Sequence, residues 1–380
     1  IFAVESTVNK LADRLSMDPI VLRQKNMIHE GDVMPAYYGE TANSCRLEEC
    51  LLKASDMIGW KEKGMRTVMP DGKIRARGVA MAMQGSSISN CDVGSVTVKL
   101  SDEGTYHITV GCTDMGTGCD TIIAQFAADV LETPIDNISV YGVDTDISPY
   151  DSGSYASSTT YLTGMAAVKA CEQLRERIIA LAAVRMNKDA SALTFDGENV
   201  IDESDGAKMS LFDIATASMC NNEISLEVTY SHSSPVSPPP FMAACAEIEA
   251  DPETGAIELL DYTACVDCGT VVNTNLARVQ TEGGLLQGIG MTLYEDIWYD
   301  ERGKNLSNSF MQYKVPSRLD TDRIRVEFDS SYEPTAKSIG EIVINTPAPA
   351  IADAVYNATG VWINELPITP EKILKGMKVI

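Results

Sequence analysis

The segment FMAACAEIEADPETGAIELLDYTACV occupies residues 241–266 and consists of two apolar runs separated by DPETG. Pro and Gly in so short a polar link favour a tight turn, and the flanking runs have the length and composition of β-strands. The segment therefore predicts a β-hairpin. A second hairpin is predicted around SDEG at 101–104, because SVTVKL and TYHITV on either side alternate apolar and polar residues.

Helical and strand patterns are mixed along the rest of the chain. The predicted helices are two short ones within 4–30 and others at 46–60, 119–131, 161–186, 276–295, 349–360 and 369–377. Asp18–Pro19 and Thr369–Pro370 have the composition of helix starts, and Gly360 that of a helix end. The predicted strands are 138–143, 224–231 and 323–328, with a further hairpin around DERGK at 300–304. Because these elements do not alternate strictly as β-α-β units, the sequence predicts an α+β protein with largely antiparallel sheets.

The proline-rich segment PVSPPP at 235–240 predicts a boundary, because proline lacks the N–H donor of regular structure and restricts the residue before it. We expect two mixed αβ subdomains, 73–234 and 235–380, preceded by a helical lead-in at 1–72. The first residue is Ile1, and its neighbours already follow a helical pattern. The lead-in is therefore expected to continue from an upstream segment or a partner chain, so that the chain is a fragment, a processed chain or a subunit that starts further upstream.

The composition argues against several classes of protein. The formal net charge is −24 and no run of Lys and Arg occurs, so nucleic acid is a poor partner. No apolar run reaches the roughly 20 residues needed to cross a bilayer, and no signal peptide is visible, so we expect a cytoplasmic protein without a membrane span. The ten cysteines are irregularly spaced, and the C-x-x-C of Cys265 and Cys268 has no second pair. Reduced thiols are therefore favoured over a zinc site, a redox pair or a disulfide scaffold.

Two Gly- and Ser-rich segments are candidates for binding a cofactor. VGCTDMGTGCDT (110–121) runs from a strand into a Gly-rich turn before a helix, where free backbone N–H groups and the helix dipole favour a phosphate. DTDISPYDSGSYASSTTYLTG (144–164) places small and hydroxyl residues before a long helix, which suits a polar cofactor. Taken alone, each segment is at least as well explained by a tight turn or a capped helix without a ligand.

Two further segments carry side chains suited to chemistry. NTNLARVQTEGGLLQGIGM (273–291) contains Gln280 in a helix with four glycines, where its amide can bind a pterin or an oxo group. Tight helix packing is the alternative explanation of those glycines. KSIGEIVINTPAPAIADAV (337–355) places Glu341 beside an apolar stretch. Burial there would suit Glu341 to act as a general base, whereas a glutamate is more often exposed.

Five segments occur in an order that resembles one known family. TDMGTGCDT resembles that family's T-E-M-G-Q-G segment, and DTDISPYDSGSYASSTTY resembles its second cofactor loop. VDCGTVVNTNLARVQTEGGLLQGIG resembles its D-x-G-x-x-x-N-P…G-Q-x-x-G-x-x-x-Q-G-x-G segment. IFAVESTVNKLADRLSMDPIVLRQKNMIHEGD resembles the stretch after its R-G-x-G-x-P loop, and KSIGE…PAIADAVYNATG…LPITPEKI its C-terminal signature. The family is that of the molybdenum hydroxylases, which includes xanthine dehydrogenases and aldehyde oxidases, and the resemblance covers nearly the whole chain.

The resemblance implies a molybdopterin-binding domain of the xanthine dehydrogenase type, as the C-terminal part of a large subunit similar to split-subunit nicotinate or xanthine dehydrogenases. It implies molybdopterin with molybdenum, in the cytosine dinucleotide form, and oxidation of an aromatic N-heterocycle with oxygen from water and hydride transfer to molybdenum. Glu341 is then the general base, and Ser86, Ser87 and Asn90 line the substrate pocket. No protein side chain is expected to bind the metal directly, because the pterin holds it. The implied cofactor-binding residues are Met115, Gly116, Thr117, Gly118, Ala156, Ser157, Ser158, Thr159, Thr160 and Gln280.

The chain departs from the family pattern at a few positions. Thr117 stands where the family usually has Gln, and Val279 stands where Gly precedes the glutamine. The sequence also lacks the C-x-x-x-x-C-x-x-C motif of an iron–sulfur cluster. The resemblance therefore implies an N-terminal molybdopterin-binding chain or segment, an iron–sulfur subunit and an FAD subunit as partners, beside a small-molecule substrate. Two alternatives stay open: an aldehyde oxidoreductase of the same family, and a catalytically silent assembly or scaffold subunit.

Overall fold

A computed structural model describes residues 1–380 except 36, 220–224, 318, 322 and 330–334. The chain divides into two compact units: unit 1 comprises Ile1–Gln84 and Pro238–Ile380, and unit 2 comprises Gly85–Ser237. The division expected from the sequence placed residues 73–84 in the subdomain 73–234. They belong to unit 1 because strand β4 (Ile74–Met83) pairs along its whole length with a strand from the C-terminal part.

Unit 1 is built on a five-stranded sheet of order β14-β13-β12-β4-β3. The pair β12 and β13 is the hairpin predicted at 241–266, and Gly255 in its turn has a φ of +74°. All neighbours in the sheet are antiparallel except β13 and β14, which run parallel. The other bounds are Arg66–Val68 for β3, Phe241–Ala250 for β12, Ile257–Asp267 for β13 and Ile324–Phe328 for β14.

Helices cover both faces of this sheet, which explains why β12 is apolar at nearly every position. Ala243 and Cys245 face one core with helix α3 (Leu47–Ile58). Met242 and Ala244 face the other core, with helices α8 (Thr274–Leu293) and α9 (Pro347–Thr359). A Cβ at Gly78 of β4 would lie 2.1 Å from the Ala350 carbonyl oxygen, so the missing side chain allows α9 to lie directly on the sheet.

Three helix ends of unit 1 match the signals that the sequence predicted. The Asp18 side chain accepts a hydrogen bond from the Ile20 N–H and begins a helix with Pro19 in its first turn. Thr369 caps the last helix in the same way, and α9 ends at Gly360 in the left-handed conformation. Further bounds in unit 1 are Phe2–Arg14 for α1, Pro19–Gln24 for α2, Trp60–Lys63 for α4, Pro370–Gly376 for α10, Val33–Met34 for β1 and Glu40–Thr41 for β2.

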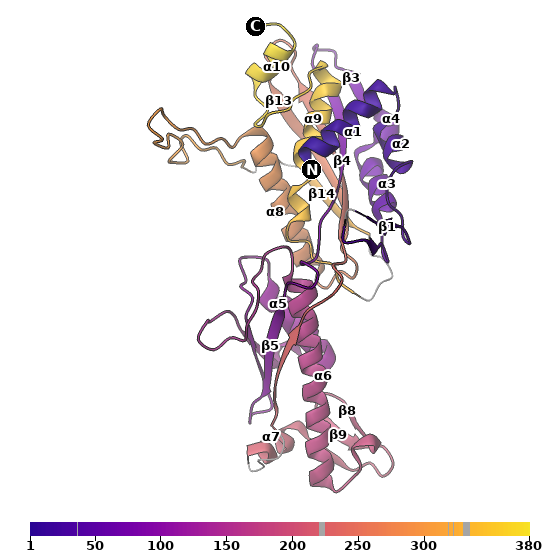
Figure 1. Ribbon diagram of the computed structural model, residues 1–380, viewed down its shortest axis with the longest axis vertical. Coiled ribbons are helices and arrows are strands. Elements are labelled where there is room, and N and C mark those ends of the chain that lie inside the picture. Colours follow the sequence, from indigo (N-terminus) through magenta and orange to yellow (C-terminus); the bar gives the residue numbers. More distant parts are fainter. Residues whose placement is uncertain (36, 220–224, 318, 322, 330–334) are drawn as a thin grey trace. The chain divides into compact units, whose positions relative to one another are not determined.

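Unit 2 has a four-stranded sheet of order β11-β5-β6-β7, with the long helix α6 (Thr159–Met186) packed on it and on helix α5 (Cys119–Leu131). The hairpin predicted around SDEG is formed by β5 and β6 (Figure 1). A smaller sheet of order β10-β9-β8 completes the unit. The bounds are Gly94–Leu100 for β5, Tyr106–Val110 for β6, Ile138–Tyr141 for β7, Leu193–Phe195 for β8, Asn199–Asp202 for β9, Lys208–Ser210 for β10, Leu211–Met219 for α7 and Glu227–His232 for β11.

The α+β architecture with largely antiparallel sheets is therefore confirmed, although each larger sheet also contains one parallel pair. The hairpin predicted around DERGK is reduced to a single antiparallel bridge between Tyr299 and Asn305. Among the helices in the described parts of the chain, none is both long and apolar enough to span a membrane.

Candidate functional site

Glu341 lies in a turn of unit 1 at the start of the short 3-10 helix η3 (Ile342–Ile344). Ile342 and Val343 are buried in the core beneath the turn, whereas Glu341 is exposed. The expectation that its apolar neighbours enclose the carboxylate is thus wrong for this structure. Those neighbours pack inward and leave the carboxylate at the surface of unit 1, where another molecule can reach it.

The glycines of α8 allow the Glu341 turn to lie against this helix. A Cβ at Gly284 would lie 2.3 Å from a methyl carbon of Val343, and one at Gly288 would lie 2.6 Å from the Pro347 ring. Neither distance is possible between real atoms, so larger residues at these positions would push the turn away. Gly283 differs, because a Cβ there would meet no atom within 4 Å. A Cβ at Gly290 would lie 2.2 Å from Glu295, so close packing explains three of the four glycines, as the alternative interpretation of this segment proposed.

Two amide side chains hold the Glu341 turn in place. Gln280 Nε2 donates a hydrogen bond to the Gly340 carbonyl oxygen at 2.9 Å. Gln84, which directly follows β4, donates from Nε2 to Glu341 Oε2 at 3.1 Å. The structure thus brings together Gln280 and Glu341, which sequence reasoning selected from separate segments. Sequence reasoning did not select Gln84. Its position between an apolar strand and the Ser86–Ser87 pair could have marked this amide as a candidate.

In unit 2, three of the predicted segments are joined by hydrogen bonds. The Thr113 N–H donates to Ser154 Oγ at 3.1 Å, and the Ser154 hydroxyl donates to the Thr113 carbonyl oxygen at 3.0 Å. The Tyr155 hydroxyl donates to Asp92 Oδ1 at 2.5 Å, which raises the pKa of Tyr155 to about 12. Asp92 Oδ2 in turn accepts a hydrogen bond from the Ile88 N–H at 2.7 Å. The Gly-rich turn, the hydroxyl-rich loop and the Ser86–Asn90 loop therefore form one cluster.

In the Gly-rich turn at 113–118 the N–H groups of both glycines are already engaged, which corrects the expectation that they are free for a ligand. Asp114 Oδ1 accepts hydrogen bonds from the N–H groups of Gly116 and Gly118 at 2.9 and 3.1 Å. Burial acts to raise the pKa of Asp114, but these backbone hydrogen bonds together lower it below its ordinary value. The carboxylate thus occupies the position in which an anionic ligand was expected.

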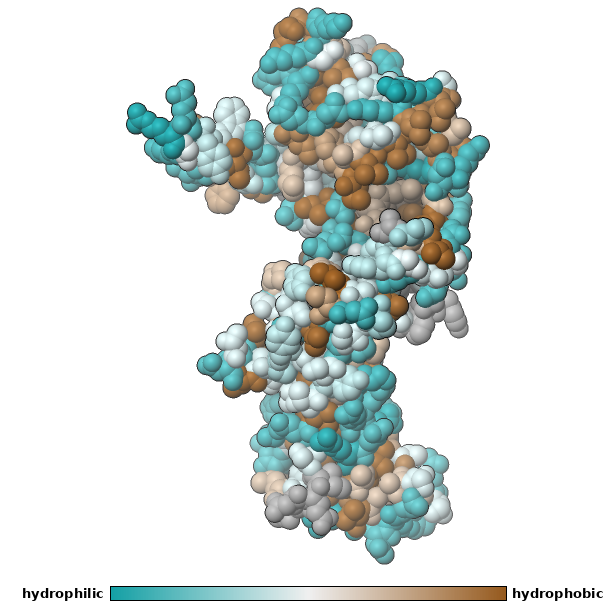
Figure 2. Space-filling view, in the orientation of Figure 1, coloured by the Kyte–Doolittle hydropathy of each residue, from teal (hydrophilic) through white to brown (hydrophobic). Residues whose placement is uncertain are grey.

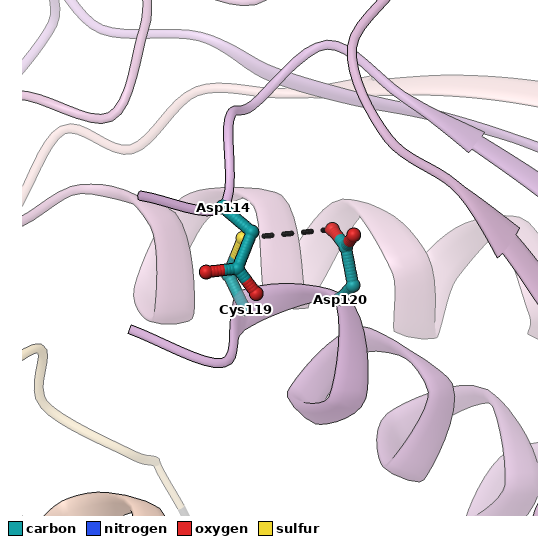
Figure 3. A group of neighbouring side chains, drawn as sticks. All are labelled: Asp114, Cys119 and Asp120. Atoms are coloured by element: carbon teal, nitrogen blue, oxygen red, sulfur yellow. Dashed lines mark hydrogen bonds between the residues drawn. The ribbon is translucent and has the colours of Figure 1, made fainter. Parts of the chain in front are cut away.

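Three potential metal ligands meet beside this turn, as Figure 3 shows: Asp114, Cys119 and Asp120 offer ligand atoms within 4.8 Å of one another. The Cys119 thiol donates to Asp120 Oδ1 at 3.7 Å. Burial and the neighbouring Asp114 charge raise the pKa of Asp120. Negative charge therefore gathers at the start of α5, and a phosphate there would meet two carboxylates.

The hydroxyl-rich loop at 153–160 has a different character. Ala156 and Ser157 adopt φ values of +51° and +53°, a left-handed conformation that costs energy for residues other than glycine. The Ser158 hydroxyl donates to the Gly153 carbonyl oxygen at 3.0 Å, and no side chain caps the start of α6. Thr159 and Thr160 occupy the first turn of α6, so hydroxyl groups and the positive helix end lie together there.

The expected substrate loop contains a buried hydroxyl group. Ser86 and Ser87 are buried, and Asn90 is exposed with a φ of +58°. Among the described residues, Ser87 Oγ has no hydrogen-bond partner. A buried hydroxyl without a hydrogen-bond partner lowers the stability of the fold unless another molecule supplies that partner. The cluster thus combines a buried hydroxyl that has no partner among the described residues with the carboxylates of Asp92 and Asp114.

The chain was compared with known proteins. Residues 53–322 match the family model described as molybdopterin cofactor-binding domain. The chain is 35% identical over 395 residues to the probable hypoxanthine oxidase XdhD of Escherichia coli K12, covering 100% of this chain and 41% of that protein. It is 31% identical to the putative xanthine dehydrogenase molybdenum-binding subunit XdhA of the same organism, covering 98% of this chain and 51% of XdhA.

A solved structure agrees with the fold. Reconstituted CO dehydrogenase from Oligotropha carboxidovorans superposes with a TM-score of 0.89 at 24% identity, covering 100% of this chain and 51% of that chain. The chain thus spans about half the length of the proteins it matches. With the family model matched over most of its length, the chain belongs to the molybdenum hydroxylase family, of which it carries a molybdopterin cofactor-binding domain.

Proposed function

We propose that this chain is the C-terminal part of the molybdopterin-binding subunit of an enzyme that oxidises an aromatic N-heterocycle, of the xanthine or nicotinate type. One observation carries the proposal: the 2.9 Å hydrogen bond from Gln280 to the Gly340 carbonyl oxygen. It joins the cofactor-binding candidate and the general-base candidate across 60 positions of sequence. Two residues chosen for complementary chemistry thus lie at the same place in unit 1.

The proposed cofactor is molybdopterin in its cytosine dinucleotide form. When bound, it would supply the molybdenum that takes up two electrons, in a reaction whose oxygen comes from water. Ala156 to Thr160 would hold it through hydroxyl and backbone groups, and Gln280 through its amide. Met115 to Gly118 are proposed to face the dinucleotide part, but the Asp114 hydrogen bonds mean that their backbone would have to rearrange to bind a phosphate.

Glu341 is the proposed general base, and Gln84 the residue that orients it. A base must present a carboxylate oxygen at hydrogen-bonding distance from the proton that it accepts. Gln84 donates a hydrogen bond to Oε2 at 3.1 Å and so restrains one oxygen of the carboxylate. The exposure of Glu341 in unit 1 is compatible with this role, because the side chain is accessible to a bound molecule.

The substrate class is supported by the character of the Ser86–Asn90 loop. Its polar groups are neutral hydroxyl and amide groups, which can donate to ring nitrogens and accept from ring N–H groups. The names of the two relatives, which refer to hypoxanthine and xanthine, support a purine or related ring over a simple aldehyde.

We also propose three partners. Because the chain spans 41% and 51% of the two relatives, the remaining half of the molybdenum-binding subunit is expected as an N-terminal segment or separate chain. An iron–sulfur subunit and an FAD subunit would remove the electrons, since no cluster motif occurs in this sequence.

Glu341→Gln in the complete native complex tests the proposed role. The amide keeps the shape of the side chain but cannot accept the proton, so kcat with a heterocycle such as xanthine should fall by about 10²- to 10⁴-fold. Molybdenum and pterin content should stay unchanged. Glu103→Gln, at an exposed turn of unit 2, is the matched control and should keep full turnover. Near-normal turnover of Glu341→Gln would remove this residue as the base.

A further inference from the structure

An apolar arm follows α8 in unit 1. We define the arm as residues 296–315, drawn in orange as the long loop that extends away from α8 in Figure 1. Its middle forms a narrow turn, in which Leu306 N donates to the Trp298 carbonyl oxygen at 2.7 Å and Asp300 N to the Lys304 carbonyl oxygen at 3.0 Å. Local hydrogen bonds thus shape the arm without the help of a hydrophobic core.

The base of the arm is fixed on α8. The Tyr313 hydroxyl donates to Glu295, which lies beside Gly290. A Cβ at Gly290 would lie 2.2 Å from Glu295 and 3.0 Å from the Pro316 ring, so both ends of the arm pack closely on this glycine. The arm therefore starts from an anchored position, which favours a defined binding surface over a loose loop.

Beyond this anchor, the arm exposes large apolar side chains. Phe310 is 83% exposed and Met311 77% exposed, and Trp298 and Tyr299 are each 62% exposed. Ile297, Leu306 and Val315 are exposed as well, so seven of the 20 arm residues are exposed large hydrophobics. In Figure 2 this projection is largely teal and pale, with a small brown, hydrophobic area. Aromatic residues and methionine are the types enriched where proteins bind proteins.

The charge of the arm is also unusual for this chain. The arm contains Asp296, Asp300 and Glu301 against Arg302, Lys304 and Lys314, and is therefore neutral, whereas the whole chain has a net charge of −24. A second copy of so acidic a chain is disfavoured as the occupant, because two such copies repel one another. A neutral apolar surface is best covered by a partner surface that is also apolar and carries little net charge.

We infer that the arm binds the other half of the molybdenum-binding subunit, the half that the relatives have and this chain does not cover. The inference rests on the proposed function, in which that half is a partner. The match spans 41% of XdhD and 51% of XdhA, so in these relatives a comparable length of polypeptide belongs to the same subunit. An arm that extends from the C-terminal end of α8, the helix that also carries Gln280, would bind the other half and hold it to unit 1.

The test is amine-directed cross-linking and mass spectrometry of the native complex, purified through a tag on this chain. Lys304 and Lys314 are exposed on the arm, and both should link to peptides that align with the unmatched half of XdhD. The double variant Phe310→Ser, Met311→Ser should lower the yield of these links roughly tenfold or more, as the loss of central apolar residues does at interfaces. Phe212→Ser, which changes an exposed phenylalanine of unit 2, is the matched control and should leave the yield unchanged.

The outcomes separate the inference from the proposed function. If the other half is present but both lysines link only to a second copy or to other subunits, the arm inference is overturned and the proposed function stands. Unchanged link yields in the double variant would also overturn it. If the complex contains no polypeptide that aligns with the other half, both the inference about the arm and the proposed N-terminal partner are refuted.

Discussion

Asp353 should make the stability of unit 1 depend on pH, and Asp353→Asn should remove that dependence. This carboxylate lies on α9, is 4% exposed, and accepts the Val79 N–H of β4 at 3.1 Å. Burial raises its pKa to about 7, against an opposing effect of Arg23. Arg23 does not neutralise it fully, because the guanidinium already pairs with the buried Glu5 at 2.7 Å.

The sign follows from proton binding. Between the ordinary pKa of 3.8 and about 7, the folded protein keeps a proton on Asp353 that the unfolded chain releases. Stability therefore falls as the pH rises through this window and levels off above it. The total loss from this group is ~4 kcal/mol, at 1.36 kcal/mol for each pKa unit between the two values. Asparagine carries no charge at any pH, so the variant should not show this loss.

Urea unfolding at several pH values between 4.5 and 8 measures the effect. All three tryptophans, Trp60, Trp298 and Trp362, lie in unit 1, so their fluorescence reports the unfolding of this unit. From pH 4.5 to pH 8, the unfolding free energy of the variant should rise by a few kcal/mol relative to that of the wild type. Other titrating groups are common to both proteins and cancel in this difference. Parallel curves for the two proteins would refute the assignment of a raised pKa to Asp353.

Two further predictions concern the Glu341 turn. Gly284→Ala forces a methyl group against Val343 and should destabilise unit 1 by about 1–3 kcal/mol in urea unfolding while lowering turnover. Gly283→Ala, its neighbour with open space, should be neutral or stabilise α8, and equal effects of the two changes would contradict the packing account. Gln84→Ala removes the hydrogen bond to Glu341, so kcat should fall about tenfold with little change in KM. A changed KM with an unchanged kcat would show that Gln84 acts on substrate binding.

Local signals in the sequence predicted local structure well. The apolar runs around DPETG, the proline after Asp18 and the glycine at 360 each act through nearby backbone geometry, and the hairpin and helix ends formed as predicted. The chain order of segments also selected Gln280 and Glu341 as candidates, and the fold places Gln280 against the residue before Glu341.

Features that depend on distant contacts could not be predicted in this way. The pairing of β4 with β12 joins strands more than 150 positions apart, and no local pattern specifies it. The Asp114 carboxylate fills the Gly-rich turn because four backbone donors converge on it, which composition does not reveal. Glu341 is exposed because its apolar neighbours turn into a core formed partly by α8. In each case the deciding partner lies elsewhere in the fold.

Metal and pterin analysis of the native complex that contains this chain is the most direct test of the central claim. Elemental mass spectrometry should find about one molybdenum atom for each copy of the chain, and mild acid should release a pterin nucleotide. An intact native complex without molybdenum would contradict the account and favour a catalytically silent assembly subunit, and the role of Glu341 as a base would then have to be abandoned.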